Sequence, residues 1–117
     1  MVNVGKENTR RTIVEKAVDD FLRKLRQRNA SPHTIKGYAQ DLEVFAGYIG
    51  PSDWNRIDHI RIRGFLSHLY ESGLSKPSVA RALAAVRSLY RWLAREGVVE
   101  QNPAALVSTP KLPKKPR

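Results

Sequence analysis

Arginines repeated along residues 75–96 could bind a polyanion. The segment reads SKPSVARALAAVRSLYRWLARE, and at about 100° per residue one side of it is apolar while the other carries arginines among small residues. Guanidinium groups donate fixed pairs of hydrogen bonds to phosphates or base edges. A charged helix face of this kind can equally be a solvated surface. The residues on this side are Pro77, Arg81, Ala84, Ser88, Arg91 and Arg95, with Arg87 at its flank.

A second polar face is predicted on the helix that follows Ser31 and Pro32. Serine caps free helix amides, and proline is accepted in the first turn. Gly37 lies on this face and lowers helix stability by about 1 kcal/mol relative to alanine, so it needs a reason. Close approach of a binding partner and tight packing between helices are both adequate reasons. The face comprises His33, Lys36, Gly37, Gln40 and Glu43.

The charge balance favours nucleic acid as the partner. The chain has 117 residues, a net charge of +10 and a pI near 10.4. Such a positive field attracts nucleic acid or an anionic membrane. Membrane binding would need an exposed apolar stripe, whereas here the apolar stripes of the helices are expected to pack against one another in a core. No apolar run is long enough to span a bilayer, so we expect no membrane partner and a cytoplasmic location. Without cysteine, and with three scattered histidines, the sequence predicts no metal site and no cofactor.

Four helices must position these two faces. Capping residues predict helix starts at Thr12, Ser31, Asp58 and Ser75. The inward stripes are expected to include Ile13 in the first helix and Ile60 in the third. No alternation typical of strands occurs, so we predict an all-α fold. A short helical turn should follow near residues 102–106, and residues 109–117 read as a basic, proline-rich linker.

Four motifs together resemble the N-terminal core-binding domain of tyrosine recombinases, the family of phage integrases and Xer recombinases. They are SPHTIKGYAQDLEVF at 31–45, SVARALAAVRSLYRWLAREG at 78–97, NPA at 102–104 and PKLPKKPR at 110–117. The resemblance covers roughly residues 12–117 and is closest to the Xer branch. It implies a SAM-like orthogonal four-helix bundle over residues 12–108. Residues 1–11 are polar, and we expect them to form a flexible N-terminus.

The resemblance also implies that the second and fourth helices cross the DNA major groove, with a catalytic domain closing a clamp around a recombination half-site. Lysines and the later arginines suit phosphates, whereas arginine and glutamine can read bases. Arg87 can instead pair with an acid inside the domain. The implied DNA-binding residues, with the phosphate contacts added from their charge, are His33, Thr34, Lys36, Gly37, Gln40, Lys76, Ser78, Arg81, Ala84, Ala85, Arg87, Arg91 and Arg95.

The catalytic residues of that family lie in a second domain that this sequence does not contain. We therefore expect residues 109–117 to lead toward an absent catalytic domain, and the chain alone not to cut DNA. The partners that the resemblance implies are double-stranded DNA and other recombinase protomers, with the isolated domain monomeric. A basic helical module for protein interaction and a nucleic-acid binder without sequence preference are the alternatives.

Overall fold

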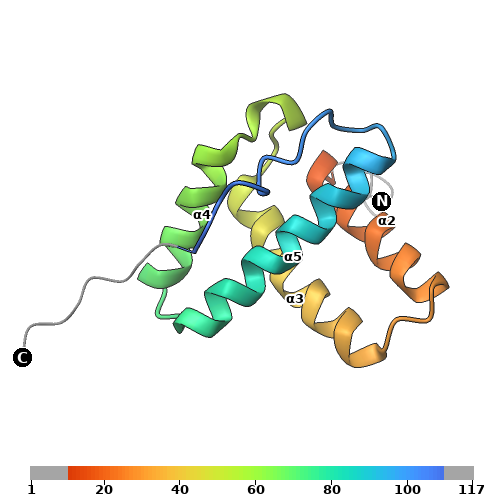
Figure 1. Ribbon diagram of the computed structural model, residues 1–117, viewed down its shortest axis with the longest axis horizontal. Helices are drawn as coiled ribbons and strands as arrows, with labels where there is room; N and C mark the ends of the chain where they lie inside the picture. Colours follow the sequence, from red (N-terminus) through yellow and green to blue (C-terminus); the bar gives the residue numbers. More distant parts are fainter. Residues whose placement is uncertain (1–10, 110–117) are drawn as a thin grey trace, which may run out of the picture.

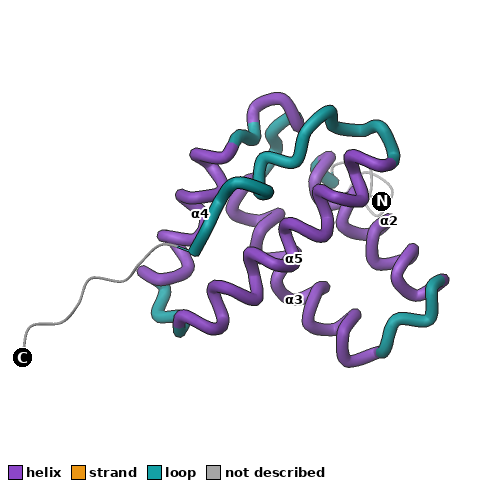
Figure 2. The backbone as a smooth tube through the Cα atoms, in the orientation of Figure 1, coloured by secondary structure: helices purple, strands orange, loops and turns teal. Residues whose placement is uncertain are grey.

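The computed structural model describes residues 11–109, and all regular structure in that range is helical (Figures 1 and 2). The predicted all-α bundle of four main helices is confirmed. The predicted N-terminal segment and basic tail lie outside the described residues, apart from Arg11 and Thr109. In the numbering of Figure 1 the elements are α2 (Ile13–Gln27), α3 (Pro32–Ile49), the short 3-10 helix η1 (Trp54–Arg56), α4 (His59–Glu71) and α5 (Lys76–Arg95).

The four long helices begin at the predicted capping residues. Thr12 forms a complete capping box with Glu15, in which each side chain bonds the other residue's backbone amide. Ser31, Asp58 and Ser75 each accept a hydrogen bond from the amide three residues later. These starts depend on neighbouring residues alone, which is why they can be predicted from the sequence.

Three of the helices end in the same way, with one residue in the left-handed backbone region. That residue is Asn29 after α2, Gly73 after α4 and Gly97 after α5, with φ of 62°, 97° and 79°. At each end the next amide bonds the carbonyl five residues back, as Ala30 does with Leu25 at 3.0 Å. The turn changes the direction of the chain, so that α3 packs against α2 and α5 packs against α4.

Two apolar residues do not face the core as predicted. Ile13 is 46% exposed and Ile60 is 62% exposed, whereas Val14 and Ile62 are fully buried. The buried stripe of α4 runs through positions 62, 65, 66 and 69, and Ile60 lies about 200° around the helix from Ile62. Ile13, at the first position of α2, falls beside the stripe that begins at Val14.

Helices α3 and α5 form the centre of the bundle. Each of them contacts the other three long helices, and they cross in the middle of the view (Figure 1). The predicted apolar stripe of α5 is buried throughout, from Val79 to Leu93. After α5 the chain turns back across the bundle toward α4, and residues 103–106 form the predicted turn (Figure 2). Because α3 and α5 pack against each other, the two predicted polar faces belong to neighbouring helices.

Candidate nucleic-acid interface

The two central helices begin with the same arrangement of hydroxyl groups. The Ser31 hydroxyl accepts the Thr34 amide at 3.1 Å and donates to the Thr34 hydroxyl at 2.9 Å. The Ser75 hydroxyl accepts the Ser78 amide at 3.4 Å and donates to the Ser78 hydroxyl at 3.1 Å. Both first turns also contain a proline, which has no amide to satisfy. Each helix therefore starts with a short, rigid and polar turn.

An ion pair joins α3 to α5. The Asp41 carboxylate accepts the Arg81 Nε–H at 2.9 Å and an Arg81 Nη2–H at 3.1 Å. The Asp41 side chain is 7% exposed and that of Arg81 is 56% exposed. The hydrogen bond and charge of Asp41 raise the pKa of Arg81 above its ordinary value, so the guanidinium stays protonated at any physiological pH. One turn earlier on α3, the Tyr38 hydroxyl lies 3.3 Å from the Ser88 hydroxyl of α5 and shares a hydrogen bond with it.

Most of the predicted DNA-binding residues lie on the surface of α3 and α5. Gly37, Ser78 and Arg87 are half-buried, and Ala85 is fully buried. No described residue forms an ion pair with Lys36, Lys76, Arg91 or Arg95, so their charges stay uncompensated. The predicted residues that are exposed are His33, Thr34, Lys36, Gln40, Lys76, Arg81, Ala84, Arg91 and Arg95.

The burial of Ala85 corrects its predicted position on the binding face. The residue has 0% exposure and belongs to the hydrophobic core. Ala82, Ala85 and Leu89 continue one buried row at helical spacing, so the apolar stripe of α5 is wider than predicted. Ala84, one residue earlier, remains exposed. A methyl group enclosed by the core cannot touch DNA in this structure.

Arg87 does not lie free on the face, and it pairs with no acid among residues 11–109. Its Nε–H donates to the Ala104 carbonyl at 3.1 Å, and its Nη2 donates to the Val107 carbonyl. The Asn102 side chain completes the contact, since its Nδ2 donates to the Arg87 carbonyl at 3.4 Å and its Oδ1 accepts the Ala104 amide at 3.0 Å. Arg87 therefore fastens residues 102–107 to α5.

The space around Gly37 excludes one of the two reasons for a glycine there. A Cβ atom built at this position has no heavy atom of another element within 4 Å. Packing between helices therefore does not require glycine at position 37. The open space lies on the same side of α3 as Asp41, one turn further along the helix.

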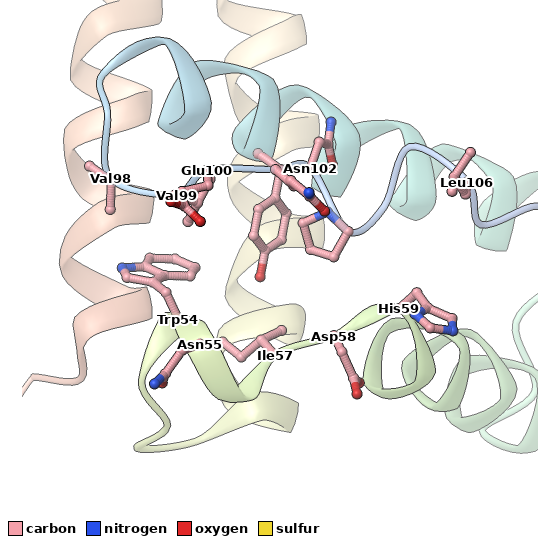
Figure 3. Close-up of a pocket in the computed structure, with 13 residues that line it drawn as sticks. Trp54, Asn55, Ile57, Asp58, His59, Val98, Val99, Glu100, Asn102 and Leu106 are labelled. Carbon is pink, nitrogen blue, oxygen red and sulfur yellow. The ribbon is translucent and has the colours of Figure 1, made fainter.

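A pocket of about 550 Å³ lies on a different surface, between η1, the start of α4 and the segment after α5 (Figure 3). Trp54 faces Val98 and Val99 across it. Among the described residues that line the pocket none is lysine or arginine, whereas Asp58 and Glu100 are acidic. The pocket lining therefore offers no lysine or arginine to a polyanion. In Figure 1 the chain around η1 and the segment after α5 lie at the upper edge, while the first turns of α3 and α5 lie at the lower edge.

The sequence alone did not single out Asp41 or Asn102. Asp41 reads as one more acid in a polar helix, and its partner is 40 residues away. Its spacing of four from Gly37 was the available signal, because it places both residues on one side of α3. The Asn-Pro dipeptide at 102–103 predicted a turn, but its attachment to Arg87 depends on how the chain folds back.

Within residues 11–109, no helix is both long and apolar enough to cross a bilayer, and no three acidic, histidine or cysteine side chains gather as metal ligands would.

Comparison with known proteins agrees with this structure. Residues 18–97 match the family described as phage integrase, N-terminal SAM-like domain. A tyrosine recombinase XerC from Oceanobacillus iheyensis is 41% identical over 105 residues, which cover 86% of this chain and 34% of that protein. Tyrosine recombinases XerC from Pseudomonas aeruginosa and Pelotomaculum thermopropionicum are 43% and 41% identical over 84% of the chain.

The chain spans about a third of the length of these relatives. No solved structure matches it. The family match covers more than half of the residues and includes all of α3, α4 and α5. The chain therefore belongs to the N-terminal SAM-like domains of the phage integrase family, within the Xer type of tyrosine recombinase.

Proposed function

We propose that this chain binds one half-site of a recombination sequence in double-stranded DNA, with α3 and α5 in the major groove. The observation that carries the proposal is the unequal distribution of charge and contacts over the two surfaces. The face of α3 and α5 bears exposed cations among small side chains. The pocket between η1 and residues 98–106 is lined by no lysine or arginine among the described residues, although η1 itself ends in the exposed Arg56.

Phosphate contacts account for the affinity in this proposal. Lys36 on α3 and Lys76, Arg91 and Arg95 on α5 are exposed. Cations of this kind bind phosphates of any sequence and position the protein on the duplex. The free amides of the two first turns add partial positive charge beside them. If these four side chains each neutralise one phosphate, the logarithm of affinity should fall with the logarithm of salt concentration with a slope of about −4.

In the whole protein, we propose that a catalytic domain closes the other side of the duplex and that the protein is a tyrosine recombinase. The relatives named above carry that name, and this chain corresponds to about a third of each. Other protomers of the recombinase are then partners in the assembled complex, and the chain acts in the cytoplasm, where its DNA lies. By itself the chain should be monomeric and should bind DNA weakly, because linked binding domains reinforce one another.

Gel-shift titrations of the 117-residue chain test the proposal. The probes are a pool of duplexes with a randomised central segment and the sequences that the chain selects from it. We expect selection of a preferred sequence together with the salt slope given above. A steep salt dependence without any selected sequence would favour the binder without sequence preference. The absence of binding even at low salt would refute both nucleic-acid functions and favour a module that binds acidic proteins.

A further inference from the structure

Asp41 is the only buried charged residue among those that the structure describes. Its residue exposure is 6%, and both carboxylate oxygens bond Arg81. A buried carboxylate is costly unless a cation compensates it, so the fold holds this pair together before any ligand arrives. The bond runs between α3 and α5, the two helices that we propose to enter the groove.

The way in which Asp41 holds Arg81 leaves one edge of the guanidinium available. The group is planar and has five N–H bonds in fixed directions. Asp41 accepts from Nε and Nη2, which form the side edge. The end edge, formed by Nη1 and the second N–H of Nη2, stays unbonded by Asp41, and the side chain is 56% exposed. That end edge can donate two parallel hydrogen bonds while the ion pair stays intact.

A small residue lies one turn from each partner of the ion pair. Ala84 lies one turn after Arg81 on α5 and is exposed. Gly37 lies one turn before Asp41 on α3, and the space beside it is open. The Tyr38–Ser88 hydrogen bond, further along α5, keeps the two helices in register. Neither Ala84 nor Gly37 has a side chain large enough to stand between a base edge and the guanidinium.

We infer that Asp41 is a positioning residue that makes Arg81 a reader of guanine. This inference rests on the proposed DNA binding. Guanine presents O6 and N7 in the major groove, and a two-pronged arginine contact is the match for that pair of acceptors. Holding the side chain in place before binding lowers the entropy lost on contact.

The same ion pair makes Arg81 a poor contact for phosphate. Asp41 neutralises its charge, and attraction to phosphates depends on net charge. Arg95, which has no ion-pair partner among the described residues, has the opposite properties. On α5, Arg81 would therefore discriminate between bases, while Arg95 would attract phosphates of any sequence.

Asp41→Asn tests the inference, because asparagine keeps the shape but loses the charge. From the randomised duplex pool, the wild-type chain should select a guanine at one position with a preference of about 5- to 150-fold over other bases. The Arg81→Ala variant should lose this preference. Asp41→Asn should lower that preference at the same position only. Its affinity for duplexes without the guanine should stay equal or rise, since the variant is one charge more positive. A purely structural role of Asp41 would weaken both kinds of duplex together.

Arg81→Lys is the second variant, in case Asp41→Asn folds poorly. It keeps the positive charge but lacks the planar fork, and it should lose the guanine preference while keeping affinity for other duplexes. Replacing the selected guanine with 7-deazaguanine, which lacks the N7 acceptor, should weaken the wild type and leave Arg81→Lys unchanged. Arg95→Ala serves as the control and should weaken all duplexes alike.

The outcomes separate this inference from the function on which it rests. If the wild-type chain selects no sequence, the proposed half-site binding fails first. If it selects a sequence but Asp41→Asn and Arg81→Lys keep the full preference, DNA binding stands and the role given to Asp41 is wrong. Selection of a base other than guanine at the position that depends on Arg81 would also overturn the inference.

Discussion

Two arginines of α5, six residues apart, show how differently the two surfaces of this domain use the same side chain. Arg81 bonds a carboxylate with one edge and leaves the other edge unbonded by that carboxylate, in a side chain that is 56% exposed. Arg87 donates to the Ala104 and Val107 carbonyls and holds the segment that returns across the bundle. Arg81 therefore keeps N–H groups that can bond a partner, whereas Arg87 uses its N–H groups in bonds within the domain. Changes near Arg81 should therefore alter binding, and changes near Arg87 should alter stability.

The largest effect on stability is expected for Arg87→Ala. The change leaves two carbonyls without their charged donor, which should lower the free energy of unfolding by about 2–4 kcal/mol. Chemical denaturation measures this loss, and hydrogen exchange should show faster exchange at residues 102–107. Arg91→Ala is the matched control on the same helix and should stay within about 0.5 kcal/mol of the wild type. If Arg87→Ala keeps its stability but loses DNA affinity as Arg91→Ala does, the division between the two arginines is wrong.

Gly37→Ala should raise stability and lower DNA affinity, whereas Arg87→Ala should lower stability. Alanine favours the helix by about 0.8–1 kcal/mol, and the open space at position 37 accepts its methyl group. We therefore expect a more stable chain that binds DNA less tightly, because the methyl group stands on the face that the duplex approaches.

Thermal denaturation and gel-shift titration of the same Gly37→Ala preparation measure the two effects. Gly47→Ala is a control, since that glycine also lies in α3 and has equally open surroundings. It should gain similar stability without loss of affinity. Tighter DNA binding by Gly37→Ala would contradict a close approach at this position.

Tyr90→Phe should have the smallest effect, and only on stability. The Tyr90 hydroxyl is buried and has no hydrogen-bond partner among the described residues, so its removal should be neutral or should stabilise the fold by up to about 1 kcal/mol at pH 7. The ring would keep its contacts with Trp54 and Phe45. DNA affinity should not change, because the pocket side of the domain is remote from the proposed face.

The pH dependence of the Tyr90→Phe variant provides a second check. Burial raises the pKa of Tyr90 in the folded chain, while in the unfolded chain the group ionises near its ordinary value of about 10. The unfolded state therefore releases this proton first, and the wild type loses stability as the pH rises above about 10. The phenylalanine variant lacks that loss, so its advantage over the wild type should grow between pH 9 and about pH 11. A constant difference would mean that the hydroxyl is not buried.

The sequence alone determined the helices, their starts and most of the core. Capping by Thr12 or Ser31 acts within a few residues, so local chemistry is enough to predict it. Where a helix has more apolar residues than its buried stripe can hold, as at Ile13 and Ile60, only the packing of neighbours chose which residue stays outside. Helical spacing supplied the two polar faces, and the family resemblance supplied the expectation that they bind the DNA major groove.

Only the tertiary structure decided what the polar residues on that face do. The partner of Arg81 is 40 residues away in the chain, and the partners of Arg87 lie in a segment that must first fold back. From the sequence both arginines read as positions on one basic face. Helical spacing fixes the side of a helix on which a residue lies, but hydrogen-bond partners depend on which helices cross and at what depth. For that reason the sequence could predict a basic surface, while the structure alone distinguished the arginine that remains available from the arginine that fastens the fold.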